Sequence, residues 1–164
     1  MSANGLFSLS PGCMTIHVGA SSGLVTVAVE PRTASPTDIN LDDWDEIGEG
    51  DLYADTGEVI VRALMDSPPE LPALTVRGPG NHRVRVHAKG RDLHTDLVAF
   101  EPIENYLIQA WPSSDPADDI MIKQSDTYGA ALRRTTFTPA PSQPRTAPPQ
   151  RATPPEHDAR RLEN

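Results

Sequence analysis

The sequence has very little cysteine and no long apolar segment. Cys13 is the single cysteine among its 164 residues, which excludes an internal disulfide and a cysteine-rich zinc site. The apolar runs are far shorter than the roughly 18 residues that a membrane-spanning helix requires, so we expect no membrane insertion. The N-terminal residues carry no positive charge ahead of their apolar positions, unlike a secretory signal. These absences predict a cytoplasmic protein.

Positive charge is also scarce. The chain has 14 lysine and arginine residues against 23 aspartate and glutamate residues, which gives a formal net charge of −9 at pH 7. Nucleic acid and anionic lipid repel such a chain, so we expect no direct binding to nucleic acid. The H-E-x-x-H motif and the glycine-rich phosphate-binding motifs are missing. The sequence therefore predicts no catalytic residues, no cofactor and no metal ion.

Proline marks where the folded part is expected to end. Residues 136–164 hold seven of the 17 prolines and only two large apolar side chains, Phe137 and Leu162. Such a segment buries too little apolar surface to offset the entropy lost on ordering. We predict a folded domain over residues 1–135 and a disordered, proline-rich tail over 136–164. The tail has a net charge of +1, so the acidity belongs to the domain.

Apolar and polar residues alternate along most of residues 1–135, and many of the apolar ones are β-branched. Gly, Pro, Asp and Ser clusters interrupt this pattern about every ten residues, a spacing typical of β-sandwiches and open barrels. We predict an all-β fold, an antiparallel β-sandwich or open barrel of about eight short strands, with a hairpin formed by 14–18 and 24–30. One short helix is predicted over 41–47. The other predicted strands cover 58–65, 73–77, 82–89, 93–100, 104–111, 120–123 and 128–132.

Negative charge is concentrated between residues 38 and 58. Nine acidic residues and no lysine or arginine occupy these 21 positions, and aromatic and aliphatic residues are interleaved with them. A solubilising loop and a surface for a basic protein both fit this composition, because opposite charge steers encounter and an aromatic side chain anchors a complex. The spacing does not match an EF-hand calcium loop. The residues predicted to contact a partner are Asp42, Asp43, Trp44, Asp45, Glu46 and Glu49, with Trp44 either an exposed anchor or part of the core.

Positive charge is concentrated in residues 82–89, where basic residues alternate strictly with small apolar ones. The alternation places the small apolar residues on the core side and leaves a basic row on the opposite face: Arg83, Arg85, His87 and Lys89. Such a row binds an anion or pairs with carboxylates on a neighbouring strand. In a chain this acidic we favour pairing, with Asp92, Asp96 or Glu58 as partners.

The best sequence candidate for an enzymatic site is a His/Asp cluster. Asp92, His94 and Asp96 alternate, so they would share one face of a strand, and His87 is near them in sequence. This spacing suits a metal ion or a general base. It is also typical of the exposed face of a half-buried strand, which is the interpretation we favour.

Several short motifs occur in an order found in a known family. They are Thr15-Ile16-His17-Val18, Asp43-Trp44-Asp45, Glu49-Gly50, the residues 54–57 before a predicted strand, residues 105–111 and Ala117-Asp118. In this order they resemble the competence protein J family of bacterial nuclease inhibitors, over most of residues 14–130. The chain also resembles uncharacterised actinobacterial proteins. The first resemblance implies an inhibitor whose acidic face occupies the basic cleft of a DNA-entry nuclease.

The function predicted from these observations is an acidic protein-binding module. It is expected to be an inhibitor or immunity-type protein that binds a basic nuclease or toxin through residues 38–58. One alternative is a structural or ligand-binding β-sandwich without enzymatic activity. A second alternative is a metal-dependent enzyme that uses His87, Asp92, His94 and Asp96.

Overall fold

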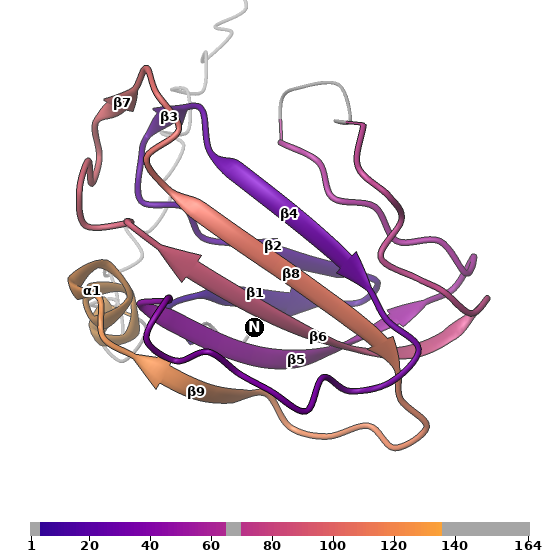
Figure 1. Cartoon of the computed structure of the whole chain (residues 1–164). Helices are drawn as coiled ribbons and strands as arrows, with labels where there is room; N and C mark the ends of the chain where they lie inside the picture. Colours follow the sequence, from indigo (N-terminus) through magenta and orange to yellow (C-terminus); the bar gives the residue numbers. More distant parts are fainter. Residues whose placement is uncertain (1–3, 65–69, 136–164) are drawn as a thin grey trace, which may run out of the picture.

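The computed structural model describes residues 4–64 and 70–135. The predicted tail over 136–164 and Met65 of a predicted strand therefore lie outside the described residues. The described chain is mostly strands with one short helix, which confirms the all-β class (Figure 1). The strands are β1 (Phe7–Ser10), β2 (Cys13–Ile16), β3 (Ser22–Gly23), β4 (Thr26–Pro31), β5 (Glu46–Ala54), β6 (Gly80–Lys89), β7 (Val98–Ala99), β8 (Asn105–Pro112) and β9 (Ile120–Gln124), and the helix is α1 (Thr127–Thr135).

The largest sheet in the described part of the chain has the strand order β4-β8-β6-β5-β9. β4 runs parallel to β8, and the other neighbours are antiparallel. Val84 and Val86 of β6 lie opposite Ala110 and Ile108 of β8, and all four side chains are buried. The alternation in the sequence thus predicts correctly which side of β6 faces the core. Within the described residues the sheet does not close into a barrel.

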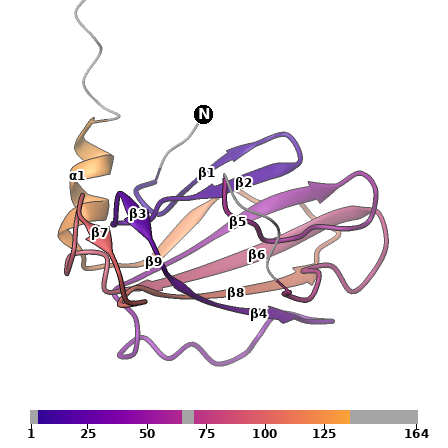
Figure 2. The same cartoon turned by 90° about the horizontal axis from the view of Figure 1, so that it is seen from above.

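Both faces of this sheet are covered. The β1–β2 hairpin packs on one face, and Figures 1 and 2 show the connection between β4 and β5 running across the other. Glycines on β5 allow the hairpin to approach, since a Cβ on Gly50 would lie 2.9 Å from side-chain carbons of both Phe7 and Leu9. The core therefore lies between the hairpin and the sheet, where Phe7 joins the apolar residues of β6 and β8.

The predicted hairpin between 14–18 and 24–30 is wrong. β2 instead pairs antiparallel with β1, and β4 pairs in parallel with β8. The turn that joins β1 to β2 is Pro11-Gly12, in which Gly12 has a φ of 68°. Proline followed by glycine is a favoured turn pair, because proline presets its own φ and glycine adopts positive φ without a steric penalty. This turn places β1 and β2 side by side before the chain reaches β4.

Two other predicted strands are irregular connections. Within the described residues of 58–65 and over 73–77 the chain forms no strand. A single backbone hydrogen bond, Leu74 N to Val59 O at 2.8 Å, joins the two segments. Val59, Val61 and Leu74 pack in or against the core, whereas other aliphatic side chains of these segments are exposed. The two segments therefore cover part of the core without forming the ladder of backbone hydrogen bonds that defines a strand.

The helix also differs from expectation. Residues 41–45 are irregular, and from Glu46 the chain enters β5 in place of the predicted helix over 41–47. The strand predicted over 128–132 lies in α1. The Asp126 carboxylate accepts a hydrogen bond from Gly129 N at 2.7 Å, an N-cap interaction that favours a helix. In the described residues no helix is long and apolar enough to cross a membrane.

Candidate functional site

The acidic segment 38–58 is divided by the start of β5. Its first part, residues 38–45, ends the connection from β4, and we name it the acidic loop. Asp38, Asp42 and Asp43 are exposed there, and none of the ion pairs among the described residues involves them. Beyond it, Glu46 and Glu49 belong to the sheet and are buried. The six predicted partner residues therefore fall into an exposed group on the loop and a buried group on β5.

Polar contacts hold the second half of the acidic loop against the sheet. Lys123 of β9 donates from Nζ to the carbonyl of Leu41 at 2.6 Å. Asp45 accepts the backbone N–H of Gly90 on Oδ2 at 2.9 Å, so its carboxylate is engaged within the protein. The exposed carboxylates of Asp42 and Asp43 are thus presented on a backbone that is fixed on either side of them, at Leu41 and Asp45.

Trp44 is half-buried, between the two roles that the sequence leaves open. Its ring centroid lies 5.3 Å from that of His87 on β6, with the planes tilted by 50°. His87 itself is buried, and its Nδ1 donates to Leu107 O at 3.1 Å. Trp44 therefore packs the acidic loop onto the sheet, and only part of its ring faces solvent.

The burial of His87 makes the stability of the fold sensitive to mild acid. Burial lowers the pKa of His87, and the charge of Arg85 lowers it further. A histidine with a lowered pKa contributes stability above its ordinary pKa, and this contribution is lost as the pH falls below about 6.5 towards the folded value. We expect the free energy of unfolding to fall between pH 7.5 and 5.5, by at most about 1.4 kcal/mol per pH unit for one proton.

The control for this prediction is His87→Asn, whose amide nitrogen on Cγ takes the place of Nδ1 and can donate to Leu107 O. Urea denaturation at several pH values is the measurement. On acidification the wild-type chain should lose more stability than the variant, because only the wild type carries His87. His17, whose pKa is also lowered by burial and by Arg91, is present in both proteins and contributes to both. Equal slopes in the two proteins would assign the effect to groups other than His87.

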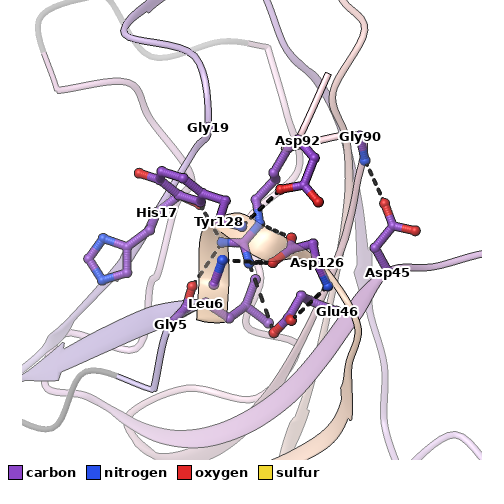
Figure 3. Close-up of polar contacts among 12 residues, drawn as sticks. Gly5, Leu6, His17, Gly19, Asp45, Glu46, Gly90, Asp92, Asp126 and Tyr128 are labelled. Atoms are coloured by element: carbon purple, nitrogen blue, oxygen red, sulfur yellow. Dashed lines mark hydrogen bonds and ion pairs between the residues drawn. The ribbon is translucent and has the colours of Figure 1, made fainter. Parts of the chain in front are cut away.

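Glu46 lies in a buried network of charges at one end of the sheet (Figure 3). Its carboxylate is fully buried and accepts hydrogen bonds from the Arg133 guanidinium of α1 at 2.9 and 3.2 Å. Burial raises the pKa of Glu46, and the neighbouring Asp126 carboxylate acts in the same direction. This side chain therefore joins β5 to α1, and its burial argues against a direct contact with a partner.

Arg91 is the centre of the same network and is fully buried. It binds the Asp126 carboxylate through two hydrogen bonds, from Nε at 2.6 Å and from Nη2 at 2.9 Å. Its Nη1 donates to the carbonyls of Gly5 at 2.9 Å and His17 at 3.1 Å. One side chain thus links the N-terminal segment, the end of β6 and the start of α1, which the sequence alone gave no reason to expect.

Glu49 is engaged in the basic row on β6. It accepts hydrogen bonds from Nε of Arg85 at 2.6 Å and Nε of Arg83 at 3.2 Å, and Asp51 pairs with Arg83 at 3.1 Å. The predicted pairing of the row with cross-strand carboxylates is confirmed for Arg83 and Arg85, whereas His87 bonds to Leu107 O and Lys89 takes part in none of the ion pairs among the described residues. The predicted partners Asp92, Asp96 and Glu58 are wrong, because β5, which the sequence did not predict as a strand, is the neighbour of β6. Glu49 is therefore a structural residue of the sheet.

The four residues of the predicted His/Asp cluster are not brought together. His87 is buried on the sheet, whereas residues 91–96 form turns in place of the predicted strand. Asp92 accepts the N–H groups of Thr127 and Tyr128 at 2.8 Å, at the N-terminus of α1. Burial raises the pKa of Asp92, but these hydrogen bonds outweigh it and lower the pKa overall. In the part of the chain described, no three histidine, cysteine or acidic side chains are grouped as metal ligands.

One motif was missed in the sequence. Residues 19–23 read Gly-Ala-Ser-Ser-Gly and match the G-x-S-x-G pattern of nucleophile elbows. The elbow requires a strand followed by a helix, but here the motif leads from β2 to β3. The backbone N–H groups of Gly19 and Ala20 bind the buried Glu104 carboxylate at 3.0 and 2.6 Å. The motif therefore lacks the strand-to-helix context of a nucleophile elbow. Its first glycine, Gly19, allows the backbone to pass close to that of Arg91, since a Cβ on Gly19 would lie 2.2 Å from Arg91 O.

Comparisons with protein-family models, with curated proteins and with solved structures find no match for this chain.

Proposed function

We propose that the chain is a cytoplasmic protein-binding module of the inhibitor or immunity type, which binds a basic protein such as a nuclease or toxin through the acidic loop. The observation that carries this proposal is the exposure of Asp38, Asp42 and Asp43, which form no ion pair with any described residue, on a loop fixed at Leu41 and Asp45. A surface that is ordered before binding loses less conformational entropy in the complex.

The chemistry of the loop suits a protein that itself binds phosphates. Nucleases and many toxins grip nucleic acid through arginine and lysine side chains in a cleft. Exposed carboxylates can replace the phosphates there through charge-assisted hydrogen bonds, and their charge accelerates the encounter. Because Glu46 and Glu49 are used inside the fold, the proposed contacts are Asp42 and Asp43, to which the exposed Asp38 of the same loop is added, with Trp44 and Asp45 as loop supports.

The scaffold is proposed to be a sandwich-like one, in which the hairpin and the β4–β5 connection cover opposite faces of the sheet. A binding site for a small ligand remains the alternative. It has one observation in its favour, an open groove of about 640 Å³ between the turns at Asp92–Asp96 and α1. Asp92 in its wall is already engaged by the N-terminus of α1 and is not free to bind a ligand.

Charge-neutral substitutions test the proposal. Affinity capture from the host lysate with the wild-type chain provides basic proteins, which are identified and then titrated individually against purified variants. Asp42→Asn/Asp43→Asn should weaken binding of a genuine partner at least about tenfold at low salt, or about 1.4 kcal/mol, with a smaller effect at high salt.

The matched control is Asp55→Asn/Glu58→Gln. These residues are also exposed and acidic, lie after the acidic loop, and their change removes the same formal charge. The control should bind as the wild type does. If both double variants weaken binding equally, net charge drives the interaction and the acidic loop is not the contact surface.

A further inference from the structure

A second exposed surface lies at the end of the sheet near β3 and β7. Five large apolar side chains are solvent-exposed there: Phe100 at 86%, Leu93 at 66%, Leu24 at 59%, Leu97 at 58% and Val98 at 48%. We name these residues the apolar patch. Phe100 alone leaves on the order of 200 Å² of aromatic surface in water. Together the five reach the few hundred Å² at which an exposed apolar area marks an interaction site.

Backbone pairing brings together the segments that carry these residues. β3 and β7 pair in parallel, with Gly23 opposite Ala99. Leu24 N then donates to Ala99 O at 3.1 Å, and Ser21 N donates to Leu97 O at 3.0 Å. Residues separated by some 70 positions in sequence are thereby held next to one another, which Figure 1 shows as the short β3 and β7 strands side by side.

The patch is also fixed in its exposed form. Asp96 N donates to Gly19 O at 2.9 Å, Leu97 N donates to His94 O at 3.0 Å, and the Thr95 hydroxyl donates to Arg91 O at 2.9 Å. Gly23 lies close against the β7 backbone, since a Cβ at this position would lie 2.0 Å from Ala99 O. These hydrogen bonds keep the leucine and phenylalanine side chains of the patch exposed to water. In a flexible loop the same side chains would fold against the core.

The charge around the patch indicates what it binds. Asp96 and Glu101 are exposed at its border, and residues 92–101, which carry four of the five patch residues, contain no lysine or arginine. A second copy of this acidic chain would bring like charges together, and anionic lipid is repelled for the same reason. A segment that carries both apolar and cationic side chains satisfies the apolar centre and the acidic border together.

We propose that the apolar patch docks a cationic amphipathic segment of a partner protein, with its apolar side chains on Leu97 and Phe100 and its cations on Asp96 and Glu101. This surface is separate from the acidic loop and does not depend on the function proposed for that loop. The partner class follows from the chemistry alone: an amphipathic helix with a basic polar face.

A model peptide tests this recognition directly. The probe is a fluorescein-labelled amphipathic helix of leucine and lysine, titrated with the full chain and followed by fluorescence anisotropy. Leu97→Ser/Phe100→Ser should weaken binding at least about tenfold. Asp96→Asn/Glu101→Gln should weaken it at low salt and have little effect at high salt. Asparagine tolerates the positive φ of 59° at Asp96, so this variant keeps the backbone.

Two controls separate the patch from general effects. Leu64→Ser removes a leucine that is 94% exposed on another segment, and it should leave peptide binding unchanged. Asp42→Asn/Asp43→Asn should also leave it unchanged. If the acidic-loop variant weakens binding as much as Leu97→Ser/Phe100→Ser does, or if the wild-type chain does not bind the peptide, the proposal fails.

Two further measurements address other occupants. Sedimentation equilibrium tests for self-association, and flotation with phosphatidylcholine vesicles tests for lipid. The proposal expects a monomer that does not float. A dimer or a vesicle-bound form that is lost in Leu97→Ser/Phe100→Ser would assign the patch to a second copy or to lipid and overturn the proposal.

Discussion

Arg91→Ala should destabilise the fold by about 3–5 kcal/mol, since removing one partner of a buried ion pair leaves an uncompensated charge. The substitution strands the Asp126 carboxylate, which is 5% exposed, and removes the donors for Gly5 O and His17 O. A loss of this size is a large fraction of the 5–15 kcal/mol that typically stabilises a domain. Urea denaturation followed by circular dichroism measures it.

The comparison variant is Arg32→Ala. Arg32 pairs with Glu30 at 2.8 Å, but both side chains are more than 40% exposed, so its removal should cost less than about 1 kcal/mol. Arg91→Lys keeps the positive charge but cannot form the bidentate pair with the Asp126 carboxylate. Its loss of stability should lie between those of Arg91→Ala and Arg32→Ala. The account of the network is wrong if Arg91→Ala costs no more than Arg32→Ala.

Because Arg91→Ala can prevent folding altogether, a double-variant cycle with Asp126→Asn supplies a second test. The two groups share two hydrogen bonds, so their effects should not add. Asp126→Asn should itself destabilise the chain, and adding Arg91→Met to it should cost less than Arg91→Met alone. Additive losses would indicate that the two side chains act independently.

The parts of the fold that could be predicted from sequence are those fixed by local pattern. In β6 apolar and polar residues alternate strictly, β8 is mostly apolar, and each of these two strands lies between strands on both sides. Their spans and the inward face of β6 follow from these patterns. The predicted β9 region is also a strand, at the edge of the sheet.

β5 could not be predicted because its stability comes from other parts of the chain. It contains three acidic residues and two glycines, which are unfavourable in isolated strands. The glycines admit Phe7 from the hairpin, and Glu49 and Asp51 face the arginines of β6. Similarly, α1 is favoured by the Asp92 carboxylate, which lies 35 positions before Thr127 in sequence. Contacts between residues so far apart in sequence cannot be recognised from a short stretch of neighbouring residues.

The same reasoning explains why only part of the candidate site was predictable. The sequence locates the acidic segment, and the acidic loop within it is exposed. Composition does not reveal that Glu46 and Glu49 turn inwards, because charge counts carry no information about partners that approach from β6 and α1. The strand β5, which the local pattern does not predict, is therefore also the reason that the sequence does not distinguish the buried Glu46 and Glu49 from the exposed residues of the acidic loop.

Glu49→Gln should destabilise the chain by about 3–5 kcal/mol, because it leaves buried guanidinium groups without their counter-charge. Arg85 is the more affected, since Glu49 is its one ion-pair partner among the described residues and its Nη1 already has no hydrogen-bond partner there. Arg83 retains Asp51 and the carbonyls of Ala117 and Asp118. Denaturant unfolding of purified variants is again the measurement.

Asp43→Asn is the matched control, because it removes one carboxylate from the same acidic segment on the exposed side. Its effect on stability should stay within about 0.5 kcal/mol. Replacing the pair by apolar residues, as in Glu49→Leu/Arg85→Met, should cost less than Glu49→Gln, since no charge is then left buried. If Asp43→Asn proves the more destabilising of the single changes, the acidic segment is not divided into a structural strand and an exposed loop. If the order is as expected, a loss of partner binding in Asp43→Asn reports on the contact itself, whereas a loss in Glu49→Gln reports on the fold.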